Sequence, residues 1–112
     1  MNSDEQVIDI FEFDPDRVQR YKIILRRNRL FGFWVGEQLG KVDCEMLDYM
    51  ASVVQSDLEE PGVLDVLRKV YVDLLAAGKK VDAADLRVKL HELHEQAHSE
   101  IGVLSPSREI TS

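Results

Sequence analysis

The sequence RRNRLFGFWVGEQLG, residues 26–40, is the stretch of this 112-residue chain that decides its fold. Its apolar side chains recur at helical spacing, and Gly40 is typical of the residue that follows a helix. Gly32 and Gly36 lie four residues apart on one face, which predicts close approach of another helix or a local kink. The stretch therefore predicts the second half of a long helix, with Phe31 and Trp34 among its core residues.

The helix starts are predicted from capping patterns. Asp14-Pro15 predicts the start of the first helix, because Asp accepts hydrogen bonds from free amide groups and Pro suits the first helical position. A second helix is predicted to begin at an Asp43 N-cap, with Val42 packed on Leu47 as a hydrophobic staple.

Two further helices follow the sequence EPG at residues 60–62, which ends the second helix. The third is predicted over residues 63–77, before Gly78, and the fourth from an Asp82 N-cap to Gly102. The residues expected on the buried faces of these last three helices are Met46, Leu47, Met50, Val53, Val54 and Leu58; Leu64, Leu67, Val70, Tyr71, Leu74 and Leu75; and Leu86, Leu90, Leu93, Ala97 and Ile101.

Four amphipathic helices without strand-like alternation predict an all-α four-helix bundle. The charge pattern changes sharply ahead of it. The first 16 residues carry six acids and no Lys or Arg, whereas residues 17–29 carry six bases and no acid. We therefore expect a mobile acidic N-terminal arm over residues 1–16, a four-helix domain over residues 17–102 and a flexible tail over residues 103–112. The arm and the basic segment are either a solvated surface or a binding arm that orders on a partner.

Composition narrows the function classes. The formal net charge of −7 argues against a chain that binds nucleic acid over its whole surface. No apolar run reaches the length of about 18 residues that spans a bilayer, so direct membrane insertion is not expected. The N-terminus has no basic segment typical of a signal peptide, and the single Cys44 cannot form an internal disulfide. A cytoplasmic location is expected.

No residue pattern indicates catalysis, so we expect no enzyme, no catalytic residue and no cofactor. His91, His94 and His98 lie on one side of the last helix, where a metal site is geometrically possible, but they flank its apolar stripe. A solvated flank is favoured, and no metal site is expected. Basic residues 17–29 with nearby aromatic residues could also contact nucleic acid, although such aromatics are more typical of a core.

Two motifs in register resemble one protein family. The first is RRNRL at residues 26–30, followed by Gly32, Trp34 and Leu39-Gly40. The second is DLEEPG at residues 57–62, followed by DVLRKV at residues 65–70. Together they resemble the zeta subunit of alphaproteobacterial F-type ATP synthases. The resemblance covers about residues 26–101.

The resemblance implies a four-helix bundle and inhibition of ATP hydrolysis by the catalytic head of the synthase. In that family a mobile N-terminal segment orders as a helix between the alpha and beta subunits, beside the rotating gamma subunit. Weak adenine-nucleotide binding is also attributed to the family. The expected partner-binding residues are Phe11, Phe13, Arg17, Arg20, Tyr21, Arg26, Arg27 and Arg29, and the possible nucleotide contacts are Glu59, Glu60, Arg68 and Lys69.

The expected function is therefore that of a regulatory subunit that binds the synthase head and inhibits ATP hydrolysis through its N-terminal segment. The alternative is a zeta-like paralogue that kept the bundle, lost inhibition and acts as a protein-binding module. This alternative arises because residues 1–16 lack the bases that alternate with acids in the family's arm. A nucleic-acid accessory protein that uses residues 17–29 is the third hypothesis.

Overall fold

The computed structural model describes residues 15–59 and 62–104, and these residues form four α-helices. They are α2 (Pro15–Gln38), α3 (Asp43–Glu59), α4 (Val63–Ala76) and α5 (Ala83–Leu104). No strand occurs in the described ranges, so the predicted all-α fold of four helices is confirmed. Of the predicted arm, residues 1–14 lie outside the described residues.

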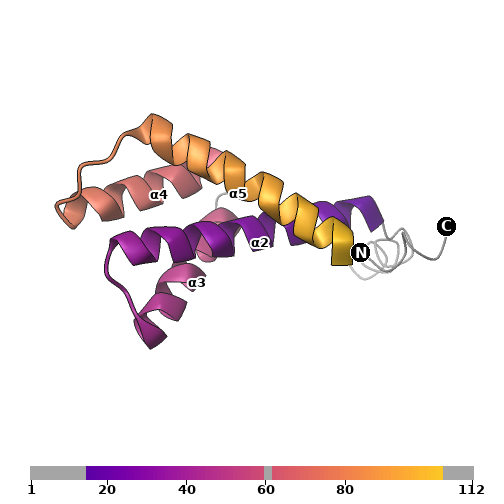
Figure 1. Cartoon of the computed structure of the whole chain (residues 1–112), viewed down its shortest axis with the longest axis horizontal. Helices are drawn as coiled ribbons and strands as arrows, with labels where there is room; N and C mark the ends of the chain where they lie inside the picture. The colour runs from indigo at the N-terminus through magenta and orange to yellow at the C-terminus, as the bar shows by residue number, and fades with distance from the viewer. Residues whose placement is uncertain (1–14, 60–61, 105–112) are drawn as a thin grey trace, which may run out of the picture.

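Helix α2 is the centre of the fold, because most of the contacts between helices are those of α2 with α3 and with α5. Figure 1 shows α3 on one side of α2 and α5 on the other, with α4 beside α5. In the described part of the chain α3 and α5 do not contact each other. The other three helices therefore surround α2 unevenly, and one long side of α3 has no helical neighbour in the described ranges.

The core is built from one apolar side of each helix. Phe31 and Val35 of α2 are fully buried, as predicted. Trp34 is half-buried and lies parallel to Phe31, with 6.2 Å between ring centroids, while the Lys89 ammonium lies 5.5 Å from the Trp34 ring. The buried cluster comprises Phe31, Val35, Tyr49, Val53, Val66, Leu67, Val70, Leu74, Leu86, Leu90 and Leu93.

The two glycines inside α2 mark its contact with α3. A Cβ atom placed on Gly32 would lie 2.9 Å from the Cα of Met50, and one placed on Gly36 would overlap the Met46 side chain. Real Cβ atoms do not approach a backbone carbon so closely, so only glycine permits this packing at residue 32. The predicted close approach of a second helix is confirmed.

The turns follow the predicted capping residues in most cases. Gly40 and Gly78 have φ angles of +75° and +78°, and each follows a helix end. After Gly40, the Lys41 amide donates to the Gly36 carbonyl at 2.9 Å, which satisfies a free acceptor at the helix C-terminus. Asp82 is the predicted N-cap of α5, since its side chain accepts from the Ala84 amide at 2.8 Å.

The start of α3 and the end of α5 differ from the predictions. Asp43 is not a side-chain cap: it is the first helical residue, has φ +53°, and no described residue donates to its carboxylate. Val42 and Leu47, the two residues of the predicted staple, are both largely exposed, and their contact stays a prediction. Helix α5 continues past Gly102 to Leu104, since glycine weakens a helix without necessarily ending it.

Several residues predicted on buried faces are exposed instead. Leu47, Leu58, Leu64 and Leu75 lie on the surface, whereas Val66 is fully buried although the apolar pattern did not include it. The periodicity of a helix predicts which residues share a face but not how many neighbours cover that face. Here α3 packs on α2 and α4 only, so the edge of its apolar stripe stays open.

Candidate functional site

The first turns of α2 carry three of the candidate partner-binding residues. Arg17, Arg20 and Tyr21 are all exposed, and Tyr21 keeps 52% of its surface accessible. Within those ranges the two arginines have no ion-pair partner. These turns lie at the end of the molecule opposite the α2–α3 and α4–α5 connections (Figure 1). They continue directly from the predicted arm, whose residues Phe11 and Phe13 are outside the described part.

Arg26 connects α2 to the end of α5. Its Nε donates to Glu100 Oε1 at 2.8 Å, and both side chains are partly exposed. Hydrogen bonds from Gln96 and from Arg26 lower the pKa of the Glu100 carboxyl. In this conformation Arg26 joins two helices, and Arg29 is the neighbouring arginine that faces solvent.

Arg27 lies inside the protein, where it takes part in a buried polar network. Its residue surface is 6% exposed, and its Nε donates to Asn28 Oδ1 at 3.0 Å. Asn28 Nδ2 donates to Asp57 Oδ2 at 3.0 Å, and Arg27 Nη2 lies 3.9 Å from the same oxygen. The other Asp57 oxygen accepts from the Gly62 amide at 3.0 Å, so one carboxylate links α2 to the α3–α4 turn.

Within this network, Arg27 is a buried residue that helps to hold the helices together. Burial lowers the pKa of Arg27, while the nearby Asp57 charge opposes that shift. An arginine remains protonated even so, and Asp57 supplies the compensating charge. Sequence reasoning placed Arg27 with the partner-binding arginines and missed Asn28. The acids Asp57, Glu59 and Glu60 near the end of α3 were the available signal. A carboxylate there can accept from the start of the next helix, as Asp57 does from the Gly62 amide.

A groove of about 400 Å³ lies between the start of α2 and the second half of α5. Ile23 and Ile24 supply its apolar part, and Arg20, His94 and His98 supply its polar part. Burial is the main cause that lowers the pKa of His94, followed by the positive charge of Arg27. His91 and His98 also lower the His94 pKa, and Glu95 raises it. The groove therefore favours a neutral imidazole at His94.

We expect the protein to lose stability as the pH falls through the unfolded-state pKa of His94, about 6.5. The unfolded chain takes up that proton more readily than the folded chain, because the folded-state pKa is lowered. The loss stops once the pH is below the folded-state pKa. Urea unfolding at about pH 7.5 and about pH 5.5 measures the difference, and His94→Gln should reduce it. The expectation is contradicted if the stability difference between the two pH values is the same for His94→Gln and for the parent chain.

The candidate nucleotide residues do not converge in the described structure. Arg68 pairs with Asp65 at 3.3 Å and is largely exposed, while Lys69 pairs with Asp73 at 3.0 Å on the other side of α4. The side chain of Glu59 and all of Glu60 lie outside the described residues. An adenine-nucleotide contact at these residues stays a prediction.

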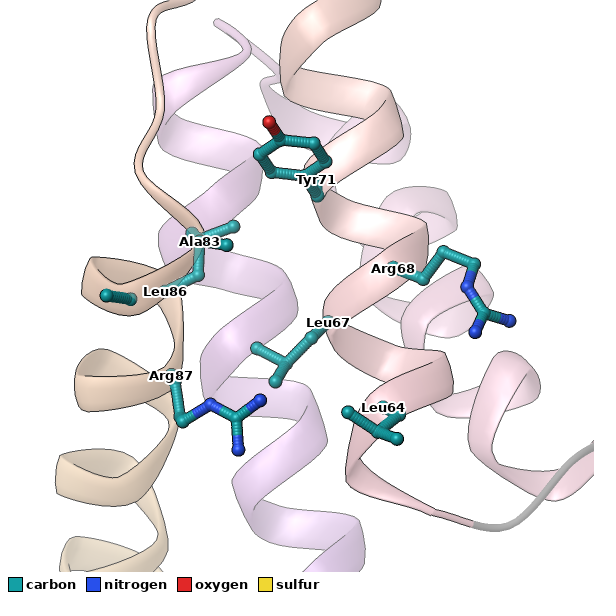
Figure 2. Close-up of a pocket in the computed structure, with 8 residues that line it drawn as sticks. Leu64, Leu67, Arg68, Tyr71, Ala83, Leu86 and Arg87 are labelled. Carbon is teal, nitrogen blue, oxygen red and sulfur yellow. The ribbon is translucent and has the colours of Figure 1, made fainter.

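A second groove, of about 500 Å³, lies between α4 and α5 and is lined in part by Arg68. Figure 2 shows Leu67 pointing from α4 toward α5, and Arg87 pointing from α5 toward α4. The Arg68 guanidinium points away from that space in the same view. The groove is an open apolar surface with one arginine directed over it, not a pocket in which two arginines meet.

Lys69 is held in place by the Asp73 carboxylate and by the ring of Tyr49. The Tyr49 hydroxyl donates to Asp73 Oδ2 at 2.8 Å, and the Lys69 ammonium lies 5.3 Å from the Tyr49 ring. Burial and the hydrogen bond to Asp73 raise the pKa of the Tyr49 hydroxyl, so it remains a donor at neutral pH. This arrangement ties α3 to α4 and accounts for Lys69 without a ligand.

Within residues 15–59 and 62–104, no group of three His, Cys, Asp or Glu side chains has the geometry to hold a metal ion. His91 and His98 are exposed, while His94 faces the α2–α5 groove. Cys44 is exposed as well. None of the described helices is long and apolar enough to cross a bilayer.

The fold and these surfaces define a class, a small all-helical protein whose functional groups lie on open helix faces and shallow grooves. The family model for the ATPase inhibitor subunit zeta matches residues 9–100, which is most of the chain. The chain therefore belongs to the ATPase inhibitor subunit zeta family. No curated protein matches the sequence. Family membership supports, in general terms, a regulatory protein that inhibits an ATP synthase.

Proposed function

We propose that this protein binds the catalytic head of an F-type ATP synthase and inhibits ATP hydrolysis through its N-terminal segment. The partners are the alpha, beta and gamma subunits, and the site of action is the cytoplasm. The family match supports the inhibitory role, and the resemblance of the two sequence motifs supports the choice of partner. The proposed inhibitory segment comprises the arm, residues 1–16, together with the exposed start of α2.

One observation carries this proposal: α2 is a single helix of 24 residues whose second half is anchored in the fold and whose first turns carry exposed residues. Its second half is fixed by the Gly32 contact and by the buried Asn28–Asp57 hydrogen bond. Its first turns present Arg17 and Arg20 to solvent. A rigid helix that projects basic groups from a stable domain is suited to carry an inhibitory segment into a partner, because its geometry is set before binding.

Reversing the charge of both exposed arginines, Arg17→Glu with Arg20→Glu, should weaken inhibition. We expect the concentration for half-inhibition of ATP hydrolysis to rise about tenfold or more, since arginines in an interface often dominate binding energy. The matched control is Lys79→Glu with Lys80→Glu, which reverses two exposed charges at the opposite end of the molecule. Equal weakening by both pairs would show a general charge effect and would contradict a specific role for the start of α2.

The second candidate is the zeta-like paralogue that kept the bundle and binds another protein. The acidic composition of residues 1–16 favours it, because these residues contain no Lys or Arg. A chimera in which the family's arm replaces residues 1–25 separates the two candidates. Inhibition by the chimera, without inhibition by the native chain, would establish the second candidate. Inhibition by both would support the first.

A further inference from the structure

The outer side of α3 carries an apolar stripe that no described helix covers. Leu47 is 64% exposed and Leu58 is 54% exposed. Between them lie Met50 and Val54, which are half-buried, and Ala51, which is exposed. Residues 47, 50, 51, 54 and 58 recur at three- and four-residue intervals, so they form one stripe along three turns of the helix.

Helix α2 forms the other bank of this surface. Arg29 lines the same groove as Leu47, Met50, Ala51 and Val54, and the groove has a volume of about 530 Å³. Phe33 lies one turn after Arg29 on the same side of α2 and is 45% exposed. We call the stripe with Arg29 and Phe33 the α2–α3 surface.

The two edges of the α2–α3 surface carry opposite charges. Arg29 is exposed on the α2 edge, and none of the described residues forms an ion pair or hydrogen bond with it. Asp48 is exposed on the far edge of α3, one residue after Leu47, and likewise has no partner within the described ranges. A binding partner therefore meets an apolar strip with a basic edge and an acidic edge.

We propose that the α2–α3 surface docks an amphipathic α-helix of a partner protein, with carboxylates over Arg29 and basic groups over Asp48. The repeat of the stripe favours a helix over an extended peptide, because helical side chains recur at the same three- and four-residue intervals. The paired charges set the orientation of the helix in the groove. This inference goes beyond the proposed inhibition, which depends on the opposite end of α2.

The probe is a synthetic amphipathic helical peptide of about four turns, with Leu on one face, Glu along one edge and Lys along the other. Fluorescence anisotropy with the full chain should give a dissociation constant of about 10–100 μM. The double variant Leu47→Ser with Leu58→Ser should weaken binding about tenfold or more. The control is Leu75→Ser, which changes a leucine of α4 that is 48% exposed and lies outside this surface.

Charge reversal at Arg29 tests the orientation. Arg29→Glu should weaken binding of the Glu-edged peptide and strengthen binding of a second peptide in which Lys occupies both edges. The proposal is overturned by absence of binding at about 1 mM peptide, by equal weakening from Leu75→Ser, or by the same response of both peptides to Arg29→Glu. Sedimentation as a dimer that Leu47→Ser dissociates would also overturn it, because a second copy would then cover the surface. None of these outcomes depends on whether the chain inhibits ATP hydrolysis.

Discussion

Replacing Asp57 with alanine should lower the free energy of unfolding by about 2–4 kcal/mol. The substitution removes the acceptor of two hydrogen bonds, one from the Asn28 amide and one from the Gly62 backbone amide. It also leaves the buried guanidinium of Arg27 without its nearby opposite charge. An unpaired buried charge is costly, so the effect should exceed the loss of a single neutral hydrogen bond.

Urea unfolding followed by circular dichroism measures this effect, with Asp48→Ala as the control. Asp48 is an exposed acid of the same helix, and its removal should change stability by no more than about 0.5 kcal/mol. Asp57→Asn keeps one acceptor oxygen and should fall between the control and Asp57→Ala. If Asp57→Ala lowers the free energy of unfolding no more than Asp48→Ala does, the network does not stabilise the fold.

Replacing Gly32 with alanine should destabilise the protein by about 1–3 kcal/mol, although alanine is the better helix former. The added Cβ would lie 2.9 Å from the Met50 Cα, so α2 and α3 must separate to accept it. Because the obstructing atom belongs to the backbone, no change of side-chain rotamer relieves the contact. Gly36→Ala should cost less, because the Met46 side chain it meets can move.

Gly102 provides a control of opposite sign. It lies inside α5, and a Cβ at this residue would meet no atom within 4 Å among the described residues. Gly102→Ala should therefore stabilise the protein by about 0.5–1 kcal/mol, the usual gain for this change in a helix. Thermal or urea unfolding of Gly32→Ala and Gly102→Ala measures whether each variant is less or more stable than the parent chain. Stabilisation by Gly32→Ala would contradict the close α2–α3 contact.

The sequence was sufficient for the features that depend on local chemistry. The pair Gly32 and Gly36 predicted either a helix contact or a kink, and the contact is found. Gly40 and Gly78 predicted helix ends, and Asp82 predicted a cap. Each of these follows from the backbone freedom of glycine or from the short Asp side chain. Local rules also predicted the four helices, with errors of one residue at the end of α4 and two residues at the end of α5.

Features that depend on which helices meet could not be predicted in the same way. Leu47 and Leu58 belong to an apolar stripe and are still exposed, because α5 does not reach α3 in the described part of the chain. Arg27 is buried, although its neighbour Arg26 is half exposed. One residue on a helix rotates the side chain by about 100°, so two adjacent arginines can have different roles. Only the packing of α3, α4 and α5 against α2 decides which of the two arginines is buried.

The same packing separates buried from exposed residues along residues 26–40. Phe31, Val35 and the glycines hold α2 in the fold, and Arg29 with Phe33 faces solvent beside α3. The exposed residues on the first turns of α2 lie beyond this anchored half. The structure thus shows a helix whose second half is packed in the fold and whose first turns are exposed.

The most direct test of the proposed function is the rate of ATP hydrolysis by the purified head of a matching F-type ATP synthase, measured with increasing concentrations of the full chain. We expect hydrolysis to fall to a low residual rate at saturation, and a chain that lacks residues 1–16 to leave the rate unchanged. Undiminished hydrolysis at saturating full-length chain, with binding to the head demonstrated in the same mixture, would contradict inhibition.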